Sequence, residues 1–94
     1  MDLTLPYKKC KSAQEAYSRV KNNLTEDYIQ KFKVKANIYY LDHKYEIEGT
    51  GKGFNLRLVF KENSCELQMK LSLLLRPIGK QVLNSVKKEL QGLI

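Results

Sequence analysis

Apolar and polar residues alternate most regularly in the second half of the chain. Large apolar residues take every second position from Phe54 to Phe60, and again from Cys65 to Leu73, with the polar turn 61–64 between the two runs. Because the side chains of a β-strand point alternately to its two faces, each run predicts a strand with one buried face. Together the runs are typical of an antiparallel hairpin that covers a core on one side.

Similar alternation predicts three further strands. The first covers the segment Leu3–Lys9, and Pro6 inside it suits a strand at the edge of a sheet. The second covers Val34–Tyr40. A hairpin loop at Asp42–Lys44 follows it, and the segment Tyr45–Ile47 opens the return strand.

The glycine-rich segment Gly49–Gly53 interrupts that return strand. A phosphate-binding loop needs its glycines at the start of a helix, whereas these glycines lie between two predicted strands. Their spacing also differs from the dinucleotide-binding and Walker patterns. We therefore expect a bend or bulge that lets the sheet curl, with Lys52 as a weak candidate for anion contact.

Two stretches repeat apolar residues at helical spacing. Ser12 and Glu15 match a capping box, which predicts a helix over Ala13–Lys31. Pro77 stands at a first-turn position, where its missing N–H costs little, and predicts a second helix over Pro77–Leu93. The apolar stripe of this second helix consists of Ile78, Val82, Val86, Leu90 and Leu93, widened by Leu83 and Ile94.

The predicted order is β-α-β-β-β-β-α, and the fold class is α+β. One apolar sheet face needs a cover, and two amphipathic helices are available to provide it. We expect a single domain over residues 1–94, built as a curved antiparallel sheet with both helices packed on one face. The sequence contains no repeat, linker or low-complexity stretch that would mark a domain boundary.

The chain is basic, with a net charge of +7 and an isoelectric point near 9.5. Residues 49–94 hold eight Lys or Arg residues against three Asp or Glu residues, so the excess lies mainly in the second half. A basic surface with an interleaved aromatic ring is what a nucleic-acid platform uses. The residues expected on the outward sheet face, as candidates for binding an anionic partner, are Lys33, Lys35, Tyr39, Arg57 and Lys70.

Residues with catalytic chemistry are few and scattered. His43 is the only histidine, and its place in a predicted loop indicates a solvated residue rather than a general base. Glu46 and Glu48 share one strand face, as a solvated acidic pair would. Cys10 and Cys65 lie in no CxxC motif or Cys/His cluster. We therefore expect a protein that is not an enzyme and has no metal site and no cofactor.

The cellular location is predicted to be cytoplasmic. The first residues lack a basic segment followed by an apolar one, so no secretion signal is predicted. No apolar run approaches the ~20 residues needed to span a bilayer, so we expect no transmembrane segment. In that compartment Cys10 and Cys65 are expected to be buried free thiols, although one disulfide between them is a second option.

The second half of the chain resembles a known bacterial family. The segment Gly53–Leu58, a polar turn, the strand ending Leu71–Pro77 and a terminal helix resemble the small polyhydroxyalkanoic acid system proteins, also called granule-region proteins. This chain departs from them in lacking tryptophan and in being strongly basic. The resemblance implies attachment to, or regulation of, polyester granules. The terminal helix, with Lys80, Lys87 and Lys88, would then be the apolar-surface helix.

Three functions follow as hypotheses. The first is a non-enzymatic binding protein associated with polyhydroxyalkanoate granules or with another protein. The second is a nucleic-acid-binding module that uses the basic sheet face. The third is a carrier of a small apolar ligand in a crevice between sheet and helix. A homodimer that shares the remaining apolar surface is compatible with each of them.

Overall fold

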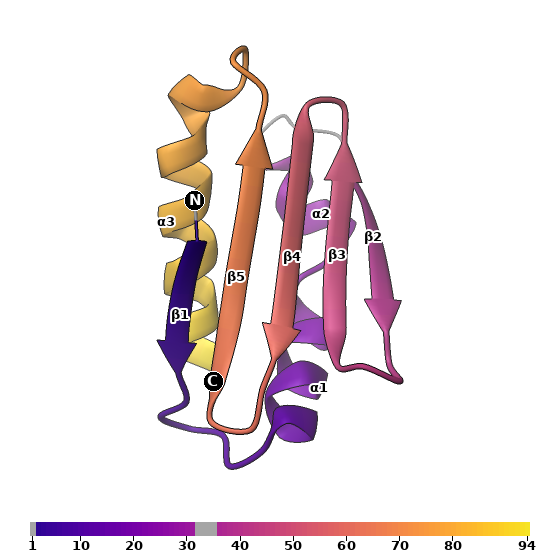
Figure 1. Cartoon of the computed structure of the whole chain (residues 1–94), viewed down its shortest axis with the longest axis vertical. Helices are drawn as coiled ribbons and strands as arrows, with labels where there is room; N and C mark the ends of the chain where they lie inside the picture. The colour runs from indigo at the N-terminus through magenta and orange to yellow at the C-terminus, as the bar shows by residue number, and fades with distance from the viewer. Residues whose placement is uncertain (1, 32–35) are drawn as a thin grey trace.

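In the described residues, five antiparallel strands form one sheet in the order β1-β5-β4-β3-β2, and three helices pack on the same face of it (Figure 1). The computed structural model describes residues 2–31 and 36–94. The α+β class and the one-sided packing of the helices are confirmed. The strands are β1 (Asp2–Pro6), β2 (Ala36–Leu41), β3 (Glu46–Gly51), β4 (Phe54–Phe60) and β5 (Ser64–Leu71), and the helices are α1 (Ala13–Asn23), α2 (Glu26–Gln30) and α3 (Arg76–Leu93).

The predicted hairpin is the β4–β5 pair at the centre of the sheet. The inward side chains of β4 are buried, while Asn55 and Arg57 between them are exposed. Alternation in β5 ends at Leu71, which pairs with Phe54, the first residue of β4. The predicted extension of this strand to Leu73 is wrong, because β4 offers no ladder partner beyond Phe54.

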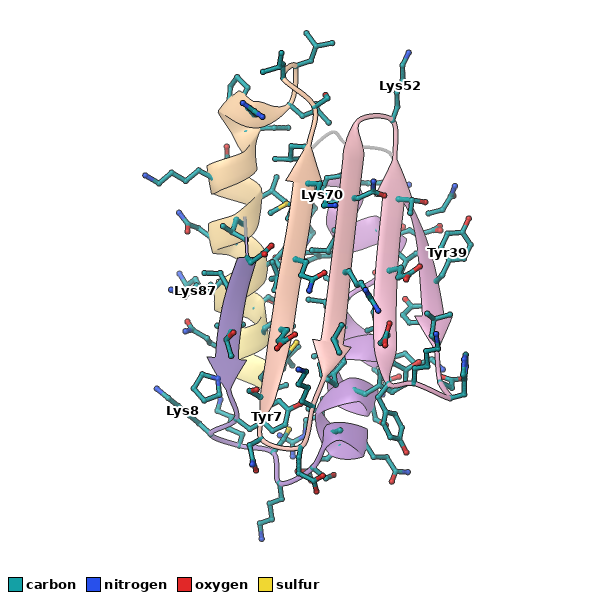
Figure 2. All side chains as sticks on the ribbon, viewed as in Figure 1. Tyr7, Lys8, Tyr39, Lys52, Lys70 and Lys87 are labelled. Carbon is teal, nitrogen blue, oxygen red and sulfur yellow. The ribbon has the colours of Figure 1, made fainter. Side chains whose placement is uncertain are left out.

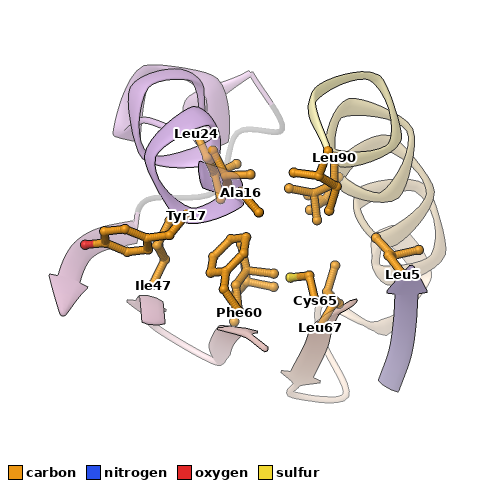
Figure 3. Packing of buried hydrophobic residues seen from close by; sticks show 14 of the residues in the cluster. Leu5, Ala16, Tyr17, Leu24, Ile47, Phe60, Cys65, Leu67 and Leu90 are labelled. Atoms are coloured by element: carbon orange, nitrogen blue, oxygen red, sulfur yellow. The ribbon is translucent and has the colours of Figure 1, made fainter. Parts of the chain in front are cut away.

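A core fills the space between the sheet and the helices (Figure 3). Val20 of α1 and Val86 and Leu90 of α3 are completely buried against it. The Tyr17 ring meets the Phe60 ring edge-on, with their centroids 5.8 Å apart. The apolar stripes that predict the helices therefore face the sheet, and their burial supplies most of the driving force for this packing.

The helix predicted over Ala13–Lys31 is divided in two. Its capping box forms, since the Glu15 N–H donates to Ser12 Oγ at 3.2 Å. However, α1 ends at Asn23, and Leu24 takes an extended conformation with φ −92° and ψ 90°. Thr25 then precedes α2 as its N-cap residue. Leu24 itself is 1% exposed, so the core-facing stripe of α1 continues into the turn between the two helices.

The glycine-rich segment contains a continuous strand followed by a tight turn. Residues of β3 keep an unbroken register with β2 and β4 as far as Gly51, so the predicted interruption within the strand is wrong. Gly49 is buried, and a Cβ there would lie 3.8 Å from the Phe54 ring. The turn itself is Lys52–Gly53, and Gly53 adopts a φ of +75°, which favours glycine.

The end of the sheet that carries the β1–α1 loop is closely tied to the end of α3. The backbone oxygen of Ile94 accepts hydrogen bonds from the N–H groups of Lys8, Lys9 and Cys10 at 2.8, 2.7 and 3.1 Å. The Lys9 ammonium also donates to the Gly92 carbonyl at 2.8 Å. These contacts satisfy carbonyl groups that a helix leaves without partners at its end. They fix β1, at the edge of the sheet as predicted, beside α3.

Both cysteines are buried free thiols, as the sequence predicts. Burial raises the pKa of the Cys65 thiol to about 12. Burial also raises the pKa of Cys10, although the nearby Arg19 opposes this shift. Neither thiol is therefore ionised at neutral pH, and both serve as small core residues.

Candidate functional site

The outward sheet face collects three of the predicted anion-binding residues. Tyr39 of β2, Arg57 of β4 and Lys70 of β5 all point away from the helices, and Tyr39 is half exposed (Figure 2). Lys33 and Lys35 lie outside the described residues. The structure therefore places three of the five predicted residues on one face.

Acidic side chains dominate the described part of this outward face. Arg57 is occupied by them, because its guanidinium lies 2.8 Å from Glu46 Oε1 and 4.0 Å from Glu48 Oε1. The hydrogen bond to Glu46 is the main reason that the pKa of Arg57 is raised. The charged strand residues here are Asp2, Glu46, Glu48, Glu66, Arg57 and Lys70, and Lys61 of the β4–β5 turn pairs with Glu66 at 3.0 Å. Carboxylates thus outnumber cations, which does not favour a nucleic-acid platform on this face.

The predicted apolar-surface helix is α3, and its apolar stripe faces the core. Val82 and Leu90 are 2% and 0% exposed, so they are not free to enter an external surface. The lysines of this helix lie on its solvent side: Lys80 and Lys88 are exposed and Lys87 is half-buried. Any apolar contact with a partner surface must therefore come from another part of the folded molecule.

Such an apolar group lies at the end of the sheet opposite the β1–α1 loop. Leu73 is 76% exposed and Leu74 is 91% exposed, in the loop that joins β5 to α3. We call residues Ser72–Leu75 the apical loop (the uppermost loop in Figure 1). Exposed leucines are common one at a time, but two adjacent ones at a protruding tip indicate a contact site.

The apical loop is held in place although its leucines are exposed. The Ser72 carbonyl accepts hydrogen bonds from the N–H groups of Leu75 and Arg76 at 3.0 and 3.1 Å. The Ser72 N–H donates to the Gly53 carbonyl at 2.8 Å, which fastens the loop to the β3–β4 turn. These bonds fix the loop backbone, so Leu73 and Leu74 are displayed by an ordered turn.

Cations surround the apical loop. Lys52 lies on the adjoining turn, Lys70 lies near the end of β5 (Figure 2), and Arg76 and Lys80 lie in the first turns of α3. We call these four residues the basic collar. Residues 67–88 contain no Asp or Glu. Within the part of the chain that the structure describes, no ion pair neutralises the collar. An apolar tip and an unneutralised positive charge therefore coincide.

A cavity of about 550 Å³ adjoins the apical loop and is lined by Met69, Lys70, Leu71 and Arg76. A second, groove-like cavity of about 480 Å³ lies between α2 and α3, and Tyr28, Ser85 and Leu93 are among the residues that line it. Both are open to the surface. The second lies between two helices, whereas the predicted crevice for an apolar ligand lies between sheet and helix, and a lysine and a glutamate also line it.

A metal site is not assembled in the described residues. They contain no group of three or more His, Cys, Asp or Glu side chains that could hold a metal ion. His43 is exposed in the β2–β3 loop, where the sequence places it. None of the helices described over residues 2–31 and 36–94 is long and apolar enough to cross a membrane.

The apical loop is the feature that sequence reasoning missed. Its leucines continue an alternating strand, so they are easily taken for the end of that strand. A signal was nevertheless present, because Leu73, Leu74 and Leu75 break the alternation with three consecutive apolar residues just before Arg76 and Pro77. An apolar run that follows a strand and precedes a proline indicates a loop that the sheet cannot bury.

Comparisons with protein-family models, with curated proteins and with solved structures found no match for this chain.

Proposed function

We propose that this protein is a non-enzymatic binding protein that attaches to an anionic surface with an apolar interior. The observation that carries the proposal is the exposure of Leu73 and Leu74, at 76% and 91%, on an ordered loop. The basic collar surrounds these leucines, so apolar insertion and charge attraction act at the same end of the molecule. A lipid-coated particle presents both matching properties.

The expected binding energies of the exposed leucines and of the basic collar support reversible attachment. Full burial of a leucine side chain is worth about 1.5–3 kcal/mol relative to exposure. Each Lys or Arg held near an anionic lipid surface adds about 1 kcal/mol. Either contribution alone gives weak binding, and stable attachment of peripheral proteins generally needs two signals. The apical loop and the basic collar would supply these two signals without unfolding α3.

A polyester storage granule is the particular surface that we propose. The resemblance to granule-region proteins supports it, and that resemblance stays a prediction because no family model matches. A granule combines an apolar polymer with a polar coat, which suits two leucines within a ring of cations. The apical loop, rather than the α3 stripe, would enter that interface, because the stripe is buried in the core.

Nucleic acid is the competing partner for the basic collar. Phosphate backbones would also attract Lys52, Lys70, Arg76 and Lys80. Two exposed leucines contribute little to binding a polyanion, whereas they would enter an apolar surface. The salt dependence separates the two partners, because binding to phosphates falls steeply as salt rises and apolar insertion does not.

Co-sedimentation tests this function. The protein is mixed with washed polyester granules, with anionic phospholipid vesicles and with duplex DNA across a salt series. The variant Leu73→Ser/Leu74→Ser is compared with Tyr39→Ser, which removes an exposed apolar side chain from β2, at the far edge of the sheet from β1. We expect the double variant to bind granules and vesicles at least about tenfold more weakly, and Tyr39→Ser to bind like the wild type.

Two results would overturn the proposal. One is wild-type protein that ignores granules and vesicles at all salt concentrations. The other is a double variant that binds as tightly as Tyr39→Ser. Binding to DNA alone, lost on raising the salt, would assign the basic collar to nucleic acid.

A further inference from the structure

We propose that the cavity lined by Met69, Lys70, Leu71 and Arg76 binds the phosphate group of an anionic phospholipid. This inference rests on the proposed attachment to an anionic surface and names the headgroup that would be recognised there. The cavity measures about 550 Å³ and adjoins the apical loop, through which Leu73 and Leu74 would enter the apolar layer. A headgroup beside the inserted leucines would therefore lie at the level of the cavity.

The cavity lies where the chain passes from β5 to α3. Met69, Lys70 and Leu71 are the last three residues of β5, and Arg76 is the first residue of α3. The apical loop joins the two elements, and the hydrogen bond from the Ser72 N–H to the Gly53 carbonyl holds this loop in place. The cavity is therefore bounded by a strand end and a helix start that an ordered loop connects.

Three groups around the cavity are suited to a phosphate. Lys70 offers an ammonium group, and Arg76 offers a planar guanidinium that can bind two phosphate oxygens at once. The Ser72 N–H points to β4, where it bonds the Gly53 carbonyl. Because N–H groups alternate in direction along a strand, the N–H of Leu71, a residue that lines the cavity, faces away from β4.

The first turn of α3 offers no comparable main-chain donors. The Arg76 N–H is bonded to the Ser72 carbonyl, and the Ile78 N–H is bonded to the Leu75 carbonyl. Pro77 has no N–H. Recognition at this site must therefore come from the two cationic side chains and the strand, which makes those side chains the residues to test.

Charge and polarity around the cavity are consistent with a lipid phosphate. Neither Lys70 nor Arg76 takes part in an ion pair among the residues that the structure describes. The nearest acidic residues in sequence are Glu66 and Glu89, and Asp2 of β1 lies opposite Gln68, two positions from Lys70. Met69 and Leu71 give the lining an apolar part, which fits the glycerol carbons and first methylene groups that accompany a lipid phosphate.

Vesicle flotation with matched lipids tests the assignment. Phosphatidylcholine vesicles carry either phosphatidic acid, which presents a phosphate, or oleic acid, which presents a carboxylate, at equal measured surface charge. We expect the wild type to bind the phosphate vesicles about tenfold more tightly. Arg76→Lys keeps the charge but loses the two-pronged geometry, so we expect it to lose this preference and retain binding to oleate vesicles.

Lys52→Gln and Lys70→Gln form a matched pair, since each removes one charge of the basic collar and only Lys70 lines the cavity. We expect Lys52→Gln to weaken binding to both kinds of vesicle about fivefold, with the preference intact. We expect Lys70→Gln to reduce the preference as well. Equal wild-type binding to both vesicles, or a preference unchanged in Arg76→Lys, would overturn the phosphate site and leave surface attachment standing.

Failure to bind either vesicle would instead overturn the attachment itself. A competitor distinguishes a lipid phosphate from a free one. Glycerol phosphate, added at the same phosphate concentration as the vesicles, should not release the protein, because it offers no apolar layer to Leu73 and Leu74. Release under those conditions would overturn the lipid assignment in favour of a small phosphate ester.

Discussion

The two ends of the sheet differ in how their polar and apolar groups are used. At the end near the β1–α1 loop, the Ile94 carbonyl accepts three backbone hydrogen bonds, and the Tyr7 hydroxyl donates to the Lys61 carbonyl at 2.6 Å. At the apical end, Leu73 and Leu74 are exposed, and the basic collar has no ion pair among the described residues. The exposed leucines and these cations lie at the same end, which indicates that both are available for a partner.

The largest effect is expected when a buried leucine of β5 and an exposed leucine of the apical loop are each replaced by alanine. Leu67 of β5 is 0% exposed and Leu74 is 91% exposed. We expect Leu67→Ala to lower the free energy of unfolding by about 2–5 kcal/mol, because it leaves a cavity in the core. Leu74→Ala should change it by less than about 0.5 kcal/mol. Urea denaturation of both variants measures the difference, and similar losses in the two would contradict the exposure of the apical loop.

Gly53→Ala tests the support beneath the apical loop and should have an intermediate effect. The φ of +75° strains any residue with a Cβ, and that Cβ would lie 2.6 Å from Ser72 Oγ. We expect stability to fall by about 1–2 kcal/mol. Thermal unfolding measures the loss. Gly92→Ala serves as the control, since a Cβ there meets nothing within 4 Å and should cost no stability.

Tyr17→Phe tests the opposite end and should have the smallest effect. The Tyr17 hydroxyl donates to Asp42, whose carboxylate also pairs with Lys21 at 2.9 Å. The bond from Tyr17 is the main cause of the lowered pKa of Asp42. A carboxyl with a lowered folded-state pKa stabilises the protein above its unfolded pKa of about 3.9, and that stabilisation is lost as the pH falls through the folded pKa.

The stability difference between wild type and Tyr17→Phe should therefore be constant near neutral pH and shrink below about pH 4. Denaturation midpoints measured from pH 7 to pH 2 would show this. A difference that stays the same down to pH 2 would mean that the hydroxyl acts independently of the Asp42 charge.

Patterns that depend on neighbouring residues could be predicted from the sequence. The alternation in β4 and β5 and the stripe of α3 each follow from one buried face, and the structure confirms these elements. The break at Leu24 could not be predicted in this way, because the helical pattern runs through it. At the break the Leu24 carbonyl has a partner in a distant strand, because it accepts a hydrogen bond from the Tyr40 hydroxyl at 3.0 Å.

Features that depend on which residues face each other across the sheet could not be predicted from the sequence either, because they involve residues that are distant along the chain. The sequence places Arg57 on the outward face, but only the pairing of Glu48 with Arg57 shows that acidic residues surround it. The cavity beside Arg76 likewise depends on how the end of β5 and the start of α3 lie next to each other. Side-chain composition gave the net charge correctly, whereas the distribution of that charge over the surface required the topology.

The place of β1 in the sheet bears on how the protein is made. Residues 36–71 form the consecutive strands β2 to β5. Each of β3, β4 and β5 pairs with the strand that precedes it, so these hairpins can close as the chain leaves the ribosome. β1 is synthesised before these strands, yet its partner is β5. Leu3 can pair with Leu67 only after Leu67 has been synthesised. Closing so long a loop costs entropy before any contact compensates it. In the nascent chain β1 therefore stays unpaired until β5 has been synthesised. It then joins the sheet that β2 to β5 have already formed.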